Sequence, residues 1–238
     1  MTAAIYASKA NLNAVILEKS VCGGLVNTTH LVENFPSQPS INGMDLMDKV
    51  KDQVEEMGVE IREVIEVDKL VLEGPVKSVE TDEGVLEAPV IILATGRKPR
   101  ELDIETECEQ IHYCAICDGS IYKDKNVLIV GGGNSGIEES MYLLSLGINH
   151  ITVIEQMDRL FASAQAQQEL QKNRDRVEIF TSTTINVLIE DNHKLESVLL
   201  HDANIDRQFQ RNIDGIFVYM GHVTQTDLFK DLIELNAQ

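Results

Sequence analysis

The chain has 238 residues, 43% of them hydrophobic, which is enough for one large domain or two modest ones with apolar cores. Its net charge of −19, from 39 acidic and 20 basic residues, argues against a nucleic-acid partner, because phosphate binding needs clustered Lys and Arg. Four cysteines are too few and too unevenly spaced for a secreted disulfide scaffold, and no segment approaches the length of a membrane span. We therefore expect a cytoplasmic protein with no membrane partner.

The first elements predict the second half of a βαβ unit. A helix of small residues over 3–10 leads into a buried strand, Ala14–Leu17, which ends at the acid Glu18. The strand and glycine turn that normally open such a unit are absent before Thr2. We therefore expect a first nucleotide-binding unit that is incomplete.

The next elements predict a helix and several short strands. Apolar residues at helical spacing over 46–57 predict a helix that stops at Gly58. The apolar run Val90–Leu93 predicts a strand that rejoins a parallel sheet, and the polar segment Arg97–Arg100 predicts a crossing between domains. Short strands are also expected around 69–72, 76–81 and 85–87.

The second half repeats the same layout with its glycine turn present. The strand Val127–Val130 leads through a glycine-rich turn into a helix over about 135–146, and the strand 151–154 ends at Glu155. The repeat predicts an α/β fold with two Rossmann-like, three-layer nucleotide-binding domains (ββα or αβα), the first of them incomplete. Later strands are expected at 177–180, 197–201 and 215–220.

Cys114 and Cys117 are separated by two residues, a spacing that allows a small, reducible disulfide ring. A helix that opens within the motif would lower the thiol pKa and favour the reactive thiolate. The alternative is a zinc site, for which only Cys108 and His112 are available upstream. Asp118 follows the pair and is a candidate proton donor to a departing thiolate, or simply a helix-capping carboxylate.

The glycine pattern Gly131-x-Gly133-x-x-Gly136 lies between a predicted strand and a predicted helix, as in dinucleotide-binding proteins. Glu155 follows at the position where a carboxylate accepts hydrogen bonds from the ribose hydroxyls of NAD. Its negative charge would repel a 2′-phosphate. Together with the dithiol, the pattern predicts electron flow from a nicotinamide to a disulfide.

These residues resemble the low-molecular-weight bacterial thioredoxin reductases over essentially the whole chain. Several of the shared motifs are specific, and they occur in the family's order. They are Thr2–Ala7, Gly23-Gly24, Val32–Pro36, Ala94–Gly96, Tyr113–Gly119, Gly131–Glu139, Asp214–Phe217 and Gly221–Val223.

The resemblance implies an FAD-binding domain formed by residues 1–99 and 222–238, and a pyridine-nucleotide domain, residues 100–221, that carries the dithiol. It places Cys117 toward the flavin, Cys114 in attack on the thioredoxin disulfide, and Asp118 as the acid. It implies a homodimer in the full-length form. The implied flavin-site residues are Glu18, Gly23, Gly24, Leu25, Asn34, Thr95 and Gly96, and the implied nucleotide-site residues are Gly131, Gly133, Asn134, Ser135, Gly136 and Glu155.

The chain also departs from the family. The basic motif that holds the 2′-phosphate of NADPH is replaced by Glu155–Phe161, so we expect NADH as the donor, with Arg159 the one basic group able to favour NADPH. The family's first glycine turn before Thr2 and its last FAD-domain segment after Asn236 are missing, which predicts weak FAD binding by this chain. The alternatives are a reductase that uses ferredoxin or a peroxidase partner, or an incomplete fragment with no activity alone.

Overall fold

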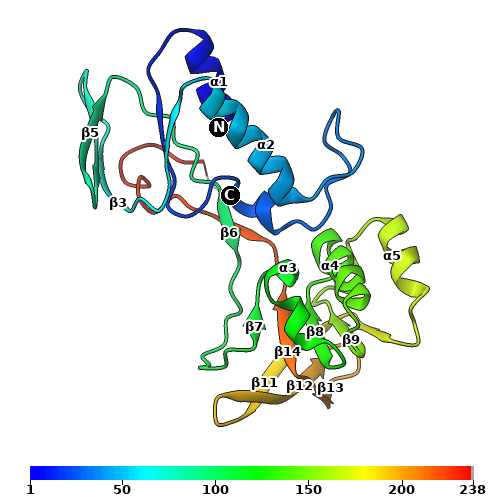
Figure 1. Cartoon of the computed structure of the whole chain (residues 1–238). Coiled ribbons are helices and arrows are strands. Elements are labelled where there is room, and N and C mark those ends of the chain that lie inside the picture. The colour runs from blue at the N-terminus through cyan, green and yellow to red at the C-terminus, as the bar shows by residue number, and fades with distance from the viewer. Residues whose placement is uncertain (237–238) are drawn as a thin grey trace. The chain divides into compact units, whose positions relative to one another are not determined.

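The computed structural model describes residues 1–236, which form two compact units (Figure 1). Unit 1 consists of Met1–Lys98 and the segment from Thr224 onward, and unit 2 consists of Pro99–Val223. The chain passes between the units through β6 (Arg97–Pro99) and β15 (His222–Thr224), which pair with each other. β6 lies within the polar segment Arg97–Arg100, for which the sequence predicts a crossing between domains.

Unit 2 is built on a five-stranded sheet in the order β10-β9-β8-β14-β7, with parallel pairing throughout. Long apolar runs form its central strands, as expected for a parallel sheet that is covered on both faces. Its strands are β7 (Ile111–His112), β8 (Asn126–Val130), β9 (His150–Ile154), β10 (Val177–Phe180) and β14 (Gly215–Val218).

Two different layers cover this sheet (Figure 1). Alternate residues of β8 face opposite ways, so Val127 and Ile129 pack in the core that includes the helices, and Leu128 and Val130 pack in the core of an antiparallel sheet. This gives the three-layer ββα arrangement. The covering elements are the helices α4 (Asn134–Ser145) and α5 (Ala164–Gln171), and the sheet β11 (Thr183–Asp191), β12 (Lys194–Asp202) and β13 (Arg207–Asn212).

Unit 1 has a smaller parallel pair, in which β1 (Val15–Leu17) pairs with β2 (Glu60–Arg62). Its core joins α1 (Thr2–Lys9) to α2 (Gly43–Glu56), whose first turn is capped by the side chain of Asn42. The unit also contains the short 3₁₀ helix η1 (Gly24–Thr28) and an antiparallel meander of β3 (Val67–Val71), β4 (Lys77–Thr81) and β5 (Gly84–Ala88).

One strand expected in unit 1 is not formed, and that prediction is wrong. The run Val90–Leu93 has no strand assignment, and Val90 and Ile92 are 70% and 66% exposed. A strand exists only where a neighbour takes up its backbone hydrogen bonds, and no ladder in residues 1–236 includes this run. Apolar composition alone therefore does not create a strand here.

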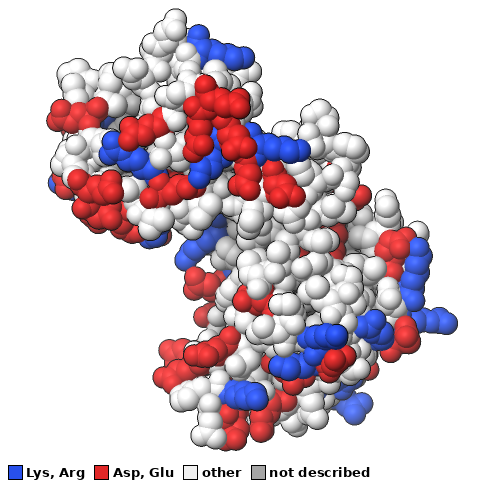
Figure 2. Space-filling model, in the orientation of Figure 1, with Lys and Arg blue, Asp and Glu red and all other residues white. Residues whose placement is uncertain are grey.

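The surface carries the charge expected from the composition. Figure 2 shows acidic side chains on the visible face of each unit, with Lys and Arg interspersed among them. The longest helix, α2, has 14 residues, and none of the helices within 1–236 has the length and apolarity needed to cross a membrane.

Candidate active site

The dithiol motif lies at the start of a short helix in unit 2. β7 leads through Tyr113 to Cys114, an extended residue that caps α3 (Ala115–Asp118). The sulfurs of Cys114 and Cys117 form a disulfide, with Cα atoms 5.3 Å apart, within the bridging limit of about 7 Å. Cys117 is exposed and Cys114 is half-buried. The pair is therefore bridged and reachable from solvent.

Asp118 is held by a histidine rather than by a helix end. Its side chain makes no capping hydrogen bond to η2 (Gly119–Tyr122), and its Oδ2 lies 3.3 Å from Nδ1 of His112. The other ring nitrogen of His112, Nε2, lies 2.7 Å from the hydroxyl of Tyr122. The capping alternative for Asp118 is not what the structure shows. From its sequence position, His112 is a candidate only as a zinc ligand, so its contact with Asp118 was not predicted.

The glycine turn of unit 2 has the close approaches that a pyrophosphate-binding turn requires. Gly131 has φ +116, and a Cβ there would lie 2.3 Å from the carbonyl oxygen of Tyr219. A Cβ on Gly136 would lie 2.1 Å from the carbonyl oxygen of Gly131, so α4 packs directly against the turn. At Gly133 a Cβ would meet nothing within 4 Å, which leaves the N-terminus of α4 open to an anion.

Glu155 closes this turn from inside the protein. It is only 9% exposed. Its Oε2 accepts a hydrogen bond from the backbone N–H of Gly132 at 2.8 Å, and its Oε1 accepts one from Met157 at 2.9 Å. Each carboxylate oxygen retains a second lone pair for a ribose hydroxyl. The contact with ribose remains a prediction, and the hydrogen bond to the glycine turn is an additional role that sequence analysis missed.

The segment after Glu155 folds over the same turn. The carbonyl oxygen of Gly132 accepts hydrogen bonds from Phe161 and Ala162, at 2.9 and 3.1 Å. Arg159 lies over the ring of Phe161, 5.2 Å from its centroid. The remaining predicted nucleotide-site residues are Asn134 and Ser135. They are the first two residues of α4, and both are exposed.

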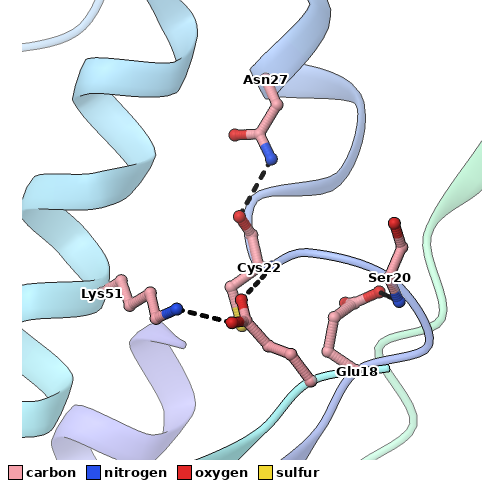
Figure 3. A network of polar contacts seen from close by, with 6 residues as sticks. Glu18, Ser20, Cys22, Asn27 and Lys51 are labelled. Atoms are coloured by element: carbon pink, nitrogen blue, oxygen red, sulfur yellow. Dashed lines mark hydrogen bonds and ion pairs between the residues drawn. The ribbon is translucent and has the colours of Figure 1, made fainter. Parts of the chain in front are cut away.

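Glu18, one of the predicted flavin residues, lies in a polar network of unit 1 together with Ser20, Cys22, Asn27 and Lys51 (Figure 3). The backbone N–H of Cys22 and the Nζ of Lys51 both donate to Glu63, at 2.8 and 2.7 Å. Asn27 donates to the Cys22 carbonyl, and its own buried Oδ1 has no partner. Glu18 accepts a hydrogen bond from the N–H of Ser20 at 3.0 Å.

Of the glycines predicted for the flavin site, Gly24 and Gly96 leave room for a ligand. Gly23 does not, because a Cβ there would lie 2.3 Å from Oδ1 of Asn27. Gly24 has φ +58, and a Cβ there would meet nothing within 4 Å. The same holds at Gly96, which has φ +68. Because the polar network of Glu18 also carries the unpartnered acceptor of Asn27, its residues fit a group that brings a hydrogen-bond donor, as a flavin does. Asn34 lies in an exposed bend, and Leu25 lies half-buried in η1.

Thr95, also predicted for the flavin site, is tied to the last segment of unit 1. Its hydroxyl donates to the carbonyl of Gln225 at 2.6 Å, and the Gln225 amide donates back to the Thr95 carbonyl at 2.8 Å. The backbone N–H of Gln225 bonds to Gly96. These bonds fix the ends of the segments that border the predicted site.

A half-buried acid in α4 was not predicted from the sequence. Burial, reinforced by the charge of Glu138, raises the pKa of Glu139 in α4 to about 7, and its Oε2 has no partner. Burial raises the pKa of Tyr219, and the nearby charge of Glu139 raises the pKa of Tyr219 further. Its hydroxyl is also buried without a partner. No sequence pattern distinguishes either residue, because Glu139 stands between Glu138 and Ser140 and Tyr219 simply follows the apolar strand β14.

The other two cysteines are free and buried. Burial raises the pKa of both Cys22 and Cys108, which keeps them as neutral thiols. Cys108 donates its S–H to the side chain of Gln110 at 3.3 Å. Within the described part of the chain, no group of three or more His, Cys, Asp and Glu side chains is arranged to hold a metal ion.

The chain as a whole matches a known protein family. Residues 1–238 match the family described as pyridine nucleotide-disulphide oxidoreductase. The chain is 37% identical over 240 residues to a 34.2 kDa protein in the rubredoxin operon of Clostridium pasteurianum, covering 99% of this chain and 77% of that protein. It is 34% identical over 241 residues to a thioredoxin reductase of Listeria innocua, covering 98% and 73%.

Solved structures agree with the fold. The crystal structure of Lactococcus lactis thioredoxin reductase superposes with a TM-score of 0.89 at 28% identity, covering 97% of this chain and 77% of that one. This confirms the predicted α/β class with Rossmann-like units.

Proposed function

Because this chain belongs to the pyridine nucleotide-disulphide oxidoreductase family and is a thioredoxin reductase-like oxidoreductase, we propose that its electron donor is NADH. The electrons pass by way of FAD to the Cys114–Cys117 disulfide. They then pass to thioredoxin or a similar small disulfide protein. One observation carries the proposal: an accessible disulfide and an open pyrophosphate-type glycine turn lie in the same unit.

The chain's own residues have distinct roles in this scheme. When bound, the nicotinamide and the flavin supply two electrons. The turn from Gly131 to Gly136 holds the nucleotide, and the loop at Gly23 and Gly24 holds the flavin. Asp118 provides the proton for the sulfur released when the disulfide is reduced, and Cys114 then attacks the partner disulfide.

The retained glycine turn favours a nucleotide donor over ferredoxin. Ferredoxin delivers single electrons without a nucleotide and would need no opening at the N-terminus of α4. The segment after Glu155 supports NADH rather than NADPH, since its first three exposed residues, Gln156, Met157 and Asp158, carry no positive charge. Arg159, the one basic residue of Glu155–Phe161, is stacked on Phe161.

Thioredoxin reduction tests the proposal directly. The protein is incubated with FAD, NADH and oxidised thioredoxin, and new thioredoxin thiols are counted. We expect thiol formation that Cys114→Ser and Cys117→Ser abolish, whereas the buried control Cys108→Ser retains it. Equal rates in all four proteins would contradict the proposal. A chain that binds no added FAD and forms no thiols would support the alternative of a fragment inactive alone.

Nucleotide choice has its own test. Calorimetric titration should show NADH binding at least about tenfold tighter than NADPH, because Glu155 and a phosphate repel by about 1 kcal/mol or more at intermediate dielectric. Replacing Gln156 and Met157 together by Arg should remove most of that preference. Equal affinities in the unmodified protein would refute the NADH assignment.

A further inference from the structure

We propose that His112 is a positioning residue for Asp118, holding its carboxylate at the end of the dithiol helix through a relay that ends at Tyr122. The inference deepens the proposed function and rests on it for the role of Asp118. It concerns how the chain handles the proton that accompanies every opening and closing of the Cys114–Cys117 disulfide.

The contacts define the relay and its tautomer. His112 Nδ1 lies 3.3 Å from Asp118 Oδ2, and Nε2 lies 2.7 Å from the Tyr122 hydroxyl. An ionised carboxylate can only accept, so Nδ1 carries the hydrogen, and Nε2 then accepts from Tyr122. This assignment satisfies all three side chains at once.

The far end of the relay is rigid. Tyr122 is 1% exposed, and its ring lies 2.4 Å from where a Cβ on Gly215 would be, so only glycine leaves room for it in β14. His112 packs against the rings of Tyr122 and Phe217, with centroids 5.3 and 5.2 Å away. The imidazole therefore cannot turn without disturbing the core.

The near end is more open, as a working carboxylate requires. The Asp118 side chain is 39% exposed, whereas that of His112 is 11% exposed. Burial lowers the pKa of His112 despite the opposing effect of the Asp118 charge, so the imidazole is neutral at physiological pH. The other charged or titratable groups that act on the relay are Cys108, Asp214 and Lys125, all through Tyr122.

The relay has a defined task in disulfide exchange. The Cys114 thiolate attacks a partner disulfide, forms a mixed disulfide and releases one partner sulfur as a thiolate. Cys117 then attacks Cys114, its thiol proton passes to Asp118, and the second partner sulfur leaves. The two electrons of the dithiol end on the two partner sulfurs. With Oδ2 held by His112, Oδ1 is left to take the proton.

The test uses the whole chain and a simple disulfide. The dithiol is reduced with dithiothreitol, the reductant is removed, and oxidised glutathione is added at pH values from 5 to 8. Closure of the Cys114–Cys117 disulfide is followed by trapping free thiols and identifying the peptides by mass spectrometry. The assay contains no flavin, nucleotide or thioredoxin, so it succeeds or fails independently of the proposed donor and partner.

His112→Phe keeps the ring contacts but removes the hydrogen bond to Asp118, and we expect closure to slow about tenfold or more. His112→Asn retains an N–H close to the position of Nδ1 and should recover most of the rate. It should also lose the rate change that the unmodified protein shows where His112 titrates, below about pH 6.5.

The decisive comparison measures the effect of His112→Phe in a protein that already carries Asp118→Asn. If His112 acts through Asp118, adding His112→Phe to Asp118→Asn should cost almost nothing further. If His112→Phe slows closure by the same factor in the unmodified protein and in Asp118→Asn, His112 only stabilises the protein structure, and the proposal would be overturned. Unchanged closure in His112→Phe would overturn it as well. Should His112→Phe fail to fold, a His112→Asn protein that closes as slowly as Asp118→Asn would overturn it.

Discussion

Two apolar runs of similar composition have different outcomes in the two units. In unit 2, β9 lies between β8 and β10, and its residues Ile151 and Val153 are completely buried. In unit 1, the run Val90–Leu93 has no strand partner in the described residues, and two of its four side chains are largely exposed. The difference shows that neighbouring strands, rather than local composition, decide whether such a run is buried.

The cores follow the same division. Unit 2 buries two clusters on opposite faces of one sheet, whereas the cluster in unit 1 that includes α1 and α2 has four buried members, namely Ala4, Ile5, Val54 and Val59. The dithiol and the better-formed glycine turn both lie in the unit with the larger core. We therefore expect the catalytic geometry to rest on the more stable part of the molecule.

The largest difference between the two units should appear in the stability lost when one isoleucine in each is replaced by alanine. Ile129→Ala empties a fully buried site in β8 and should destabilise unit 2 by about 2–5 kcal/mol, the range for large-to-small changes in a core. Ile92→Ala, the same chemical change at an exposed site, should stay within about 0.5 kcal/mol. Hydrogen exchange of peptides from each unit measures both. Similar losses at the two positions would break the comparison.

The two glycine turns should differ by a smaller amount. Gly131→Ala combines a positive φ with a Cβ placed 2.3 Å from a backbone oxygen, so a loss of about 2–3 kcal/mol and of nucleotide binding is expected. Gly24→Ala has only the positive φ against it and should cost about 1 kcal/mol. Urea denaturation and NADH titration of both variants check this. A Gly24→Ala loss as large as that of Gly131→Ala would contradict the geometry.

Two carboxylates should give the units opposite responses to pH. The raised pKa of Glu139 means that its favourable contribution is complete below pH 4.5 and is lost as pH rises through about 7. Glu139→Gln should therefore stabilise unit 2 above pH 7. The residue is partly exposed, so we expect a gain of about 1–2 kcal/mol.

In unit 1, hydrogen bonds from Cys22 and Lys51 lower the pKa of Glu63, so its contribution is present above pH 4.5 and is lost in acid. Glu63→Gln should destabilise unit 1 at neutral pH by about 1 kcal/mol or less, and the loss should shrink as the solution is acidified. Unfolding free energies of both variants, measured at pH 4, 6 and 8, test whether the two substitutions change stability in opposite directions. The same pH trend in both would refute this account.

Sequence patterns located the parts of the site that depend on consecutive residues. The strand before Gly131, the helix after it and the spacing of Cys114 and Cys117 are local, and the structure forms each of them. In contrast, β13 has a single large apolar residue, Phe209, whose ring packs 4.9 Å from that of Phe180. Such a strand has no periodicity to detect.

The relay at Asp118 was invisible for a related reason. His112 reaches Asp118 because a strand, a cap and a short helix turn back on one another, and no repeat spacing encodes that geometry. Val90–Leu93 is the converse case, since its pattern is that of a strand but its pairing depends on residues elsewhere. Local patterns thus predicted the elements, and contacts between elements determined the rest.

Differential alkylation of the four cysteines tests most directly the central claim that electrons from NADH reach Cys114 and Cys117. The protein is incubated anaerobically with FAD, with or without NADH, trapped with N-ethylmaleimide and read peptide by peptide, with dithiothreitol as the positive control. We predict that NADH makes Cys114 and Cys117 reactive while Cys22 and Cys108 stay unlabelled until the protein is unfolded. Labelling of Cys114 and Cys117 by dithiothreitol but never by NADH would contradict the account.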